Sequence, residues 1–334
     1  MQLGEIEIEP LAAESLGVRS FCTLVKTPDI RLVLDPSAAL AMRERLEPHP
    51  IEYQILIKSL ERIFVESRKA DVLSISHYHY DHVRPGFTDF RYNLSSREEL
   101  QRMFDGKTIL AKDNRENINP SQRRRGFYFE KDVQSISEEI HWSDGTAFEF
   151  GATKVTCSHP LSHGPSDTKL GYVIATIIEY EGSSVMFAPD LQGPVVQEDL
   201  TYILSSSPDL LLVGGPPLYL KKFEERHRQS AFQSLTRLVT EIPLVVVDHH
   251  LMRSKDWLNW LGPIKVAAER AGNQVMSIAE MLGTENRCLE SMRTSLYSEQ
   301  PPESDFLHWT DATDEYKKRN LPPLNIALDK SRTS

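Results

Sequence analysis

Four potential metal ligands, His77, His79, Asp81 and His82, fall within the six-residue stretch HYHYDH. Alternate residues of an extended segment point the same way, so His77 and His79 can bind one ion. A turn after them lets Asp81 and His82 reach a second ion. Imidazole nitrogens and carboxylate oxygens without cysteine suit Zn²⁺ and also admit Fe or Mn. The stretch therefore predicts two divalent metal ions, with zinc as the first choice.

Further polar residues follow directly after apolar runs typical of strands. Asp35 follows the run 31–34, Asp190 follows 184–188, and the pair His249 and His250 follows 244–247. Strand ends collect at one edge of a sheet, and HYHYDH itself follows the apolar stretch 71–76. We therefore expect these segments to meet despite their distance in sequence.

A loop after the strand-like run 154–157 adds another imidazole, from either His159 or His163. At the other end of the site, His249 and His250 compete for one position because neighbours on a strand face opposite ways. Asp190 has an alternative role as a turn residue before Gly193.

The elements expected to position these residues alternate between strands and helices. The region 38–68 shows helical spacing interrupted by Pro48 and Pro50, which predicts two helices, and 113–125 lacks a core period and reads as a loop. Strands are expected at 5–9, 20–26, 127–129, 147–150, 172–180 and 210–213, and helices at 230–240 and 304–319.

Bulk properties narrow the class of protein. The chain has 334 residues with a net charge of −10, which argues against a dedicated nucleic-acid binder. Its three cysteines, Cys22, Cys157 and Cys288, are scattered singly, as in a reducing compartment. No signal peptide or membrane span is recognisable, so a cytoplasmic location is expected.

These motifs resemble the metallo-β-lactamase superfamily of metal-dependent hydrolases, whose five successive motifs match this order. The resemblance is strongest to a group of predicted hydrolases that share SHYHYDH, INPSQRRR, HGPSDTKLGYVI, PDLQGP, GGPPLYL and DHHLMR. It implies an α/β fold of the αββα sandwich type, with a domain at 1–290. Residues 291–334 would be a C-terminal extension that packs on this domain or meets a second subunit of a homo-oligomer.

The resemblance also implies roles for individual residues. The first metal would be held by His77, His79 and His163, the second by Asp81, His82 and His249, and Asp190 would bridge them, with Asp35 behind the site as a hydrogen-bond acceptor. His163 is favoured over His159 because a His-Gly pair before a strand is the family's arrangement, and His249 is favoured because Arg253 follows it. Because the zinc β-lactamases carry cysteine where this chain has Asp190, antibiotic hydrolysis is disfavoured.

Other residues are candidates for contacting the substrate. Arg123, Arg124 and Arg125 could bind an anionic group, although a solvated basic surface is an equal alternative. Asp81, His250 and His227 are the candidates for a direct catalytic part, with Tyr219 as a further candidate acid. Two ions would hold a bridging hydroxide ready at neutral pH.

The resulting hypothesis is a hydrolase of a small ester, lactone, thioester or phosphoester. Two alternatives remain within the same fold, a nuclease or phosphodiesterase acting on RNA or DNA and a di-iron redox protein. The net negative charge disfavours the nuclease or phosphodiesterase. The di-iron redox protein normally comes with a flavin-binding domain, which no motif here indicates. A structural scaffold is disfavoured because structural zinc sites are usually single and cysteine-rich.

Overall fold

The computed structural model of the chain describes residues 1–166 and 169–324, which form two seven-stranded sheets and one two-stranded pair. The first sheet runs in chain order through β1 (Gln2–Leu3), β2 (Ile6–Pro10), β3 (Thr23–Lys26), β4 (Arg31–Leu34), β5 (Val72–Ile75), β6 (Thr108–Ala111) and β7 (Glu139–Trp142). The second is ordered β16 (Gln274–Met276), β15 (Leu244–Asp248), β14 (Leu210–Gly214), β13 (Ser183–Ala188), β12 (Thr176–Tyr180), β9 (Thr153–Cys157) and β8 (Ala147–Phe150). The small pair is β10 (Leu161–Ser162) with β11 (Tyr172–Val173).

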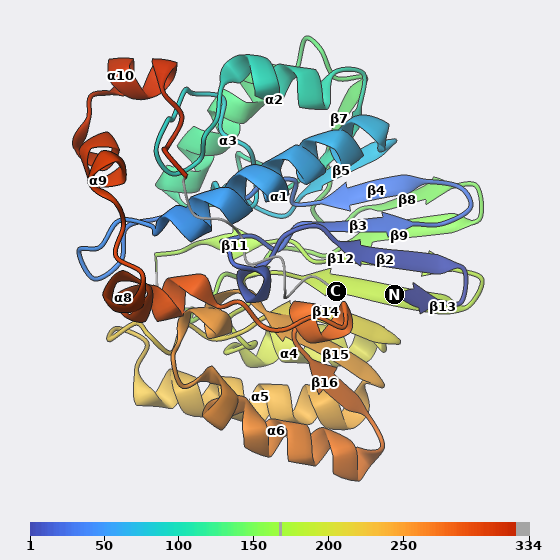
Figure 1. Cartoon of the computed structure of the whole chain (residues 1–334). Helices are drawn as coiled ribbons and strands as arrows, with labels where there is room; N and C mark the ends of the chain where they lie inside the picture. The colour runs from blue at the N-terminus through green and yellow to red at the C-terminus, as the bar shows by residue number, and fades with distance from the viewer. Residues whose placement is uncertain (167–168, 325–334) are drawn as a thin grey trace.

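Helices cover the outer face of each sheet (Figure 1). The first sheet carries α1 (Pro50–Lys69), α2 (Arg97–Phe104) and α3 (Pro120–Val133), and the second carries α4 (Gln197–Ser206), α5 (Glu225–Glu241) and α6 (Trp257–Ala271). Short helices η1 (Glu14–Leu16), η2 (His249–Arg253) and α7 (Ile278–Met281) lie in the connections, and α8 (Leu289–Glu299), α9 (Ser304–Asp311) and α10 (Asp314–Arg319) follow. None of the helices described here is long and apolar enough to cross a membrane.

Alternation along the central strands produces the four layers. In β4, Leu32 and Leu34 pack between the sheets while Val33 faces the helices. In β14, Leu212 points inward and Leu211 points to the opposite helices. Because successive side chains of a strand point to opposite faces, each sheet must be covered on both sides. The predicted αββα sandwich is therefore confirmed.

The strands that carry the candidate site are parallel neighbours. β4 pairs with β5 in parallel, and β13, β14 and β15 form a parallel run in the other sheet. Parallel neighbours end at the same edge, which brings the residues after β4, β5, β13 and β15 together.

The predicted pair of helices between residues 38 and 68 is wrong. Only α1 forms there, and it begins at Pro50. His49 caps it and accepts a hydrogen bond from the backbone N–H of Ile51, while Glu52 accepts from the His49 N–H at 2.7 Å. Proline at the first helical position starts a helix, because its missing N–H has no partner there in any case. Pro50 is therefore a start and not a break.

The predicted loop at 113–125 is right for residues 113–119 and wrong from Pro120 onward, and the predicted strand at 127–129 is wrong. Pro120 opens α3, capped by Asn119, whose side chain accepts from the backbone N–H of Gln122 at 2.8 Å. The buried positions Gln122, Gly126, Phe129 and Val133 recur at helical spacing. Hydrophobicity alone does not show this period, because two of the buried positions are a glutamine and a glycine.

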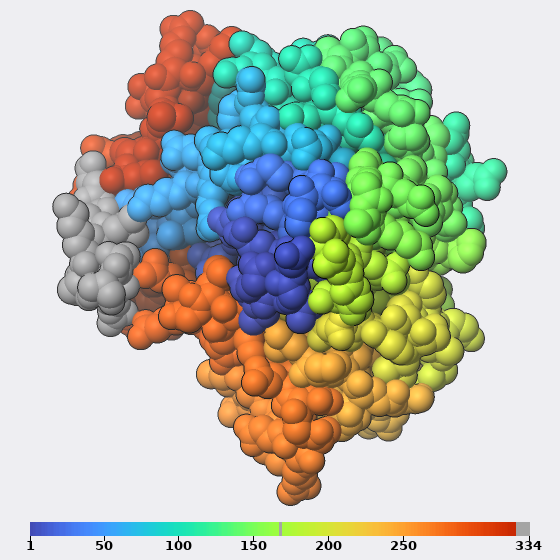
Figure 2. All heavy atoms as spheres, turned by 90° about the vertical axis from the view of Figure 1, so that its right-hand side faces the viewer, coloured from blue at the N-terminus to red at the C-terminus, as the bar shows by residue number. Residues whose placement is uncertain are grey.

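The predicted helix at 304–319 is two helices, α9 and α10, and Thr313 caps the second. Phe306 and Trp309 of α9 are buried and pack against Tyr53 of α1, with ring centroids 5.7 and 5.3 Å away. Figure 2 shows the red C-terminal residues against the blue and cyan part of the chain. From these contacts we propose that the extension 291–334 folds together with the domain 1–290, although residues 325–334 lie outside the described part.

Candidate metal centre

The side chains expected to meet at the sheet edge do so. The structure brings together His77, His79, Asp81, His82, His163, Asp190, His249 and His250, in groups whose potential ligand atoms lie within 4.8 Å of one another. His159 is exposed and lies against Gly145, outside these groups. Of the two loop histidines, His163 is thus the one beside HYHYDH.

One set of imidazoles surrounds a single oxygen of Asp190. Asp190 Oδ2 lies 3.1 Å from His77 Nε2 and 2.9 Å from His163 Nε2, and the His79 Nδ1 atom is 3.9 Å away. His77 and His79 come from the segment after β5, and His163 comes from the loop after β10. Together with Asp190 they form a compact group of nitrogen and oxygen donors.

A second set approaches Asp190 from the other side. His249 Nε2 lies 2.8 Å from Asp190 Oδ1, and His82 Nε2 lies 3.4 Å from Asp190 Oδ2. Asp81 Oδ2 completes this set at 3.8 Å from His249 Nε2. The Asp190 carboxylate therefore stands between two groups of donors.

The backbone turns sharply where these strands end. Asp35, Asp190 and His249 have φ angles of 48°, 50° and 64°, in the left-handed region that non-glycine residues rarely adopt. Such residues cluster at functional sites because the surrounding structure must hold them there. The turns aim each side chain across the sheet edge.

Hydrogen bonds hold the ring orientations of His77 and His82. His82 Nδ1 lies 2.8 Å from Asp35 Oδ2. Ser76 Oγ donates to the same carboxylate at 2.6 Å and lies 2.9 Å from His77 Nδ1. With each Nδ1–H donating outward, each Nε2 presents a lone pair to the site, which is how proteins orient metal-binding imidazoles.

Glu14, from η1, does the same for His249 and was not expected from the sequence. Its Oε2 lies 2.7 Å from His249 Nδ1, and its Oε1 accepts from Arg253 Nε at 2.5 Å. Arg253 Nη2 in turn donates to Asp81 Oδ2 at 3.2 Å. Glu14 lies 235 residues from His249 in the chain, so no local motif marks it.

Electrostatics show that this donor set fits a cation. The Nε2 atoms of His82 and His249 lie 3.2 Å apart and both face the Asp190 carboxylate. Burial lowers the pKa of His77 and of His79, which keeps these rings neutral, with lone pairs available. Burial opposes ionisation of Asp190, but the nearby His249 and His82 hold its pKa well below the usual range. Converging lone pairs and a carboxylate repel one another unless positive charge lies among them, so the residues fit divalent metal ions.

Two of these imidazoles, His249 and His82, also bind protons readily. Burial disfavours the charged form of His249, yet Glu14 and Asp190 raise its pKa to about 9. Burial likewise opposes the charge on His82, and Asp190 and Asp35 raise its pKa well above its ordinary value. Metal ions and protons therefore compete for these two rings.

Comparison with known proteins places the chain in a family. A model described as "Beta-lactamase superfamily domain" matches residues 31–215, more than half of the chain. The chain belongs to the β-lactamase superfamily. This confirms the resemblance seen in the sequence, and the matched span includes every residue of the first donor set.

Sequence relatives match more of the chain than that span. A UPF0282 protein of Methanopyrus kandleri is 38% identical over 88% of this chain and 100% of its own length, and one of Metallosphaera sedula is 36% identical over 88% and 93%. A solved structure described as a metal-dependent hydrolase of the beta-lactamase superfamily is 11% identical, with a TM-score of 0.46 over 81% of this chain and 95% of that one.

In this superfamily member, both His249 and His250 face the site. The expectation that neighbours point opposite ways is wrong here, because β15 ends at Asp248 and η2 begins at His249. The two ring centroids are 4.3 Å apart, and His250 Nδ1 lies 3.8 Å from Asp190 Oδ1. Burial lowers the pKa of His250 well below its ordinary value, so this imidazole is neutral.

A cavity of about 370 Å³ lies over the donor sets. His79, Asp81, His163 and His250 form its floor, and Tyr80, Arg125, Gln192, Leu220 and Arg253 are among its walls. The two tyrosines of HYHYDH differ, since Tyr78 is fully buried whereas Tyr80 lines this cavity.

The residues predicted to contact substrate or to act as an acid differ in whether they line a cavity. Arg125 lines the cavity, Arg124 lines a neighbouring one, and the exposed Arg123 donates to the Arg115 carbonyl at 2.8 Å, outside both. His227, in the first turn of α5, packs on the ring of Phe223 and does not line the cavity over the donor sets. The predictions that Arg123 and His227 contact substrate therefore have no support from their positions.

Proposed function

We propose that this protein is a hydrolase that uses two divalent metal ions, with zinc as the first choice and Fe or Mn as alternatives. Its substrate would be a small ester, lactone, thioester or phosphoester with an anionic group. The observation that carries the proposal is the Asp190 carboxylate, which has one oxygen 2.9 Å from His163 Nε2 and the other 2.8 Å from His249 Nε2. A carboxylate between two imidazole sets is suited to bridge two ions.

The proposed ligands divide as the two donor sets do. His77, His79 and His163 would hold one ion, Asp81, His82 and His249 the other, and Asp190 both. When bound, two such ions would supply a nucleophile from water at neutral pH and would neutralise charge on the attacked group. Asp35 and Glu14 keep His82 and His249 oriented, so that little reorganisation is needed when substrate binds.

Proton transfer to the leaving group is assigned to His250. Its side chain lines the cavity, and its buried Nδ1, 3.8 Å from Asp190 Oδ1, has no hydrogen-bond partner in the described residues. A neutral imidazole can accept a proton from solvent or substrate and return it to a leaving oxygen or sulfur. Tyr219 lies farther back, where its hydroxyl accepts from Arg253 Nη1 at 3.4 Å.

Metal content and turnover test the proposal together. Protein purified without chelator should contain close to two metal ions per chain by elemental mass spectrometry, and should hydrolyse bis-p-nitrophenyl phosphate or p-nitrophenyl acetate until chelator is added. Asp190→Asn should lose at least one ion and reduce turnover by at least about 100-fold, because the amide cannot bridge. Asp105→Asn, at an exposed position, is the matched control. One ion or none, with no turnover after reconstitution, would sink the two-metal assignment.

A further inference from the structure

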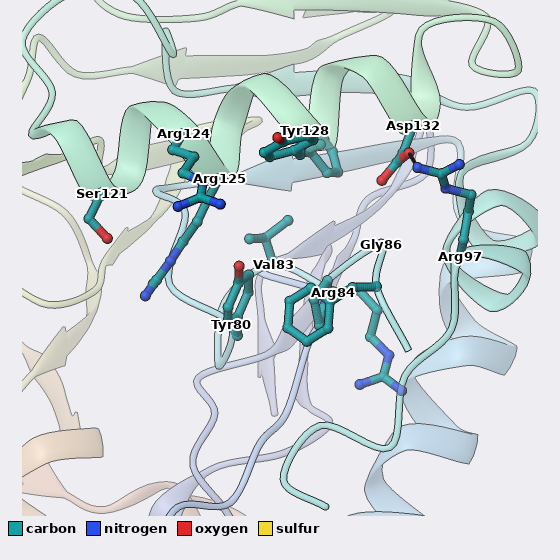
Figure 3. Close-up of a pocket in the computed structure, with 13 residues that line it drawn as sticks. Tyr80, Val83, Arg84, Gly86, Arg97, Ser121, Arg124, Arg125, Tyr128 and Asp132 are labelled. Carbon is teal, nitrogen blue, oxygen red and sulfur yellow. Dashed lines mark ion pairs between the residues drawn. The ribbon is translucent and has the colours of Figure 1, made fainter. Parts of the chain in front are cut away.

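A second cavity adjoins the one over the donor sets (Figure 3). It has a volume of about 550 Å³ and lies between α3 and the chain that follows HYHYDH. Arg124, Arg125 and Tyr128 enter it from α3, and Tyr80 enters from the opposite side. Phe87 also lines it. This volume falls in the range of small-molecule sites, which is about 300–1,000 Å³.

Positive charge is concentrated in this second cavity. Its lining holds four arginines and one carboxylate, in a protein whose net charge is −10. Two of the arginines are neutralised locally, since Arg84 pairs with Glu99 at 2.7 Å and Arg97 pairs with Asp132 at 2.8 Å. The charge left for a ligand is that of Arg124 and Arg125.

The Arg124 and Arg125 guanidinium groups remain available. In the part of the chain that the structure describes, the Arg124 side chain has no hydrogen bond or ion pair with the protein. Arg125 donates to the Tyr78 carbonyl at 3.3 Å and places its guanidinium carbon 4.4 Å from the centre of the Tyr80 ring. An arginine stacked on an aromatic ring is held in orientation, with donors still free for an anion.

Aromatic rings supply the apolar walls. The Tyr80 and Phe87 rings meet edge to face, with centroids 5.2 Å apart. Tyr128 stands opposite on α3 and is 48% exposed, and Phe87 is 46% exposed. Large aromatic side chains left uncovered around a concave site favour a flat ring between them.

Gly86 preserves the far end of this cavity. A Cβ atom there would lie 1.9 Å from Asp132 Oδ2, where the carboxylate pairs with Arg97. Any side chain at Gly86 would therefore force the Asp132 carboxylate to move.

The two cavities share Tyr80 and Arg125. Tyr80 stands in the chain between His79 and Asp81, one from each donor set. A substrate that reached from one cavity to the other would place its reacting bond over the donor sets.

We propose that the Arg124–Arg125 cavity binds a substrate part that consists of a planar ring carrying an anionic group, such as a phosphate, sulfonate or carboxylate. The proposal rests on the proposed function for the position of the scissile bond. Arg124 and Arg125 bind the anion, and Tyr80, Phe87 and Tyr128 enclose the ring. The hydrolase thus selects anionic aromatic substrates through a site separate from the metal ligands.

Binding of naphthalene-1-sulfonate to the full chain tests this, with fluorescence or calorimetry as the readout. Sulfonate coordinates metals weakly, so its binding reports on the arginines and the aromatic walls. We expect saturable binding that is at least about tenfold weaker in Arg124→Ala and in Arg125→Ala, since each loses a charge-assisted contact. Arg123→Ala, on the same helix but outside the cavity, should bind like the wild type. 1-Naphthol and inorganic sulfate should each bind more weakly than the combined probe.

The outcomes separate this proposal from the hydrolase assignment. Asp190→Asn should lose turnover but keep full sulfonate binding, because it leaves the Arg124–Arg125 cavity intact. Sulfonate binding that is absent, or equally affected by Arg123→Ala and Arg124→Ala, would overturn the cavity proposal, even with two metals and turnover. Sulfonate binding that depends on Arg124, in a protein without metal or turnover, would support the cavity proposal and contradict the hydrolase proposal.

Discussion

Each ring of the second donor set is held by a carboxylate behind it. Asp35 accepts from His82 and Glu14 lies against His249, at 2.8 and 2.7 Å. His163 Nδ1, by contrast, has no hydrogen-bond partner in the described residues. The second set is therefore the more rigidly oriented, and its affinity for metal should depend most on these carboxylates.

Glu14→Gln tests that dependence. An amide is a weaker acceptor for the His249 N–H and leaves Arg253 with Asp81 as its remaining carboxylate partner, so metal affinity should fall by about 10–100-fold. Competition with a chromophoric chelator measures the affinity, and circular dichroism checks the fold. Glu5→Gln, exposed in the turn between β1 and β2, should change nothing. Unchanged affinity in Glu14→Gln would show that Glu14 only balances Arg253.

At the scale of elements, the position of α3 decides the shape of both cavities. Gly126 lies against the ligand-bearing segment, where an added Cβ would meet Asn114 Cβ at 2.6 Å and Tyr78 Cε2 at 2.8 Å. Tyr78 cannot yield easily, because it is fully buried and its hydroxyl donates to the Lys112 carbonyl at 2.5 Å. The close approach of helix to segment thus requires glycine.

Gly126→Ala should destabilise the protein by about 1–3 kcal/mol through overpacking. Intrinsic helix propensity acts the other way and favours alanine by about 1 kcal/mol. Urea unfolding measures the sign of the change in unfolding free energy, which shows whether overpacking or helix propensity dominates. Lys131→Ala, exposed on the same helix, should stay within about 0.5 kcal/mol of the wild type. A stabilised Gly126→Ala protein would mean that α3 shifts freely.

At the scale of the molecule, buried and partly buried ion pairs join the region around α8 to the first sheet and its loops. Glu290 pairs with Arg19 at 2.6 Å and with Arg43 at 3.4 Å, and Arg293 pairs with Glu52 at 2.7 Å. These contacts span more than 240 residues of sequence. They link the C-terminal helices to the segments beside the candidate site.

The Glu290 pair predicts a pH dependence of stability. Burial opposes the Glu290 charge, but Arg19, together with Arg253 and Arg293, more than offsets it and lowers the pKa from 4.5 to about 2. A lowered pKa means that the stabilisation is complete above about pH 4.5 and is lost as pH falls toward about 2. Its size is on the order of 3 kcal/mol.

Glu290→Gln should therefore be less stable than the wild type at pH 7, by a margin that shrinks as pH falls below about 4.5. Urea unfolding at pH 7 and at pH 3 measures the margin, and effects common to both proteins cancel. Glu299→Gln, exposed on the same helix, should show no such trend. A margin that is independent of pH would contradict the role given to the Arg19 pair.

The sequence by itself determined the superfamily, the sandwich and the residues that meet at the sheet edge. HYHYDH and the strand-ending Asp190 were visible because ligand type and strand period are local properties. Only the tertiary structure revealed Glu14, the joint approach of His249 and His250, and the Arg124–Arg125 cavity. These depend on contacts between distant segments and on the backbone conformation at strand ends, which local periodicity does not encode. The errors at α1 and α3 have a related cause, since a proline or glycine acts as start or packing residue only in relation to its neighbours.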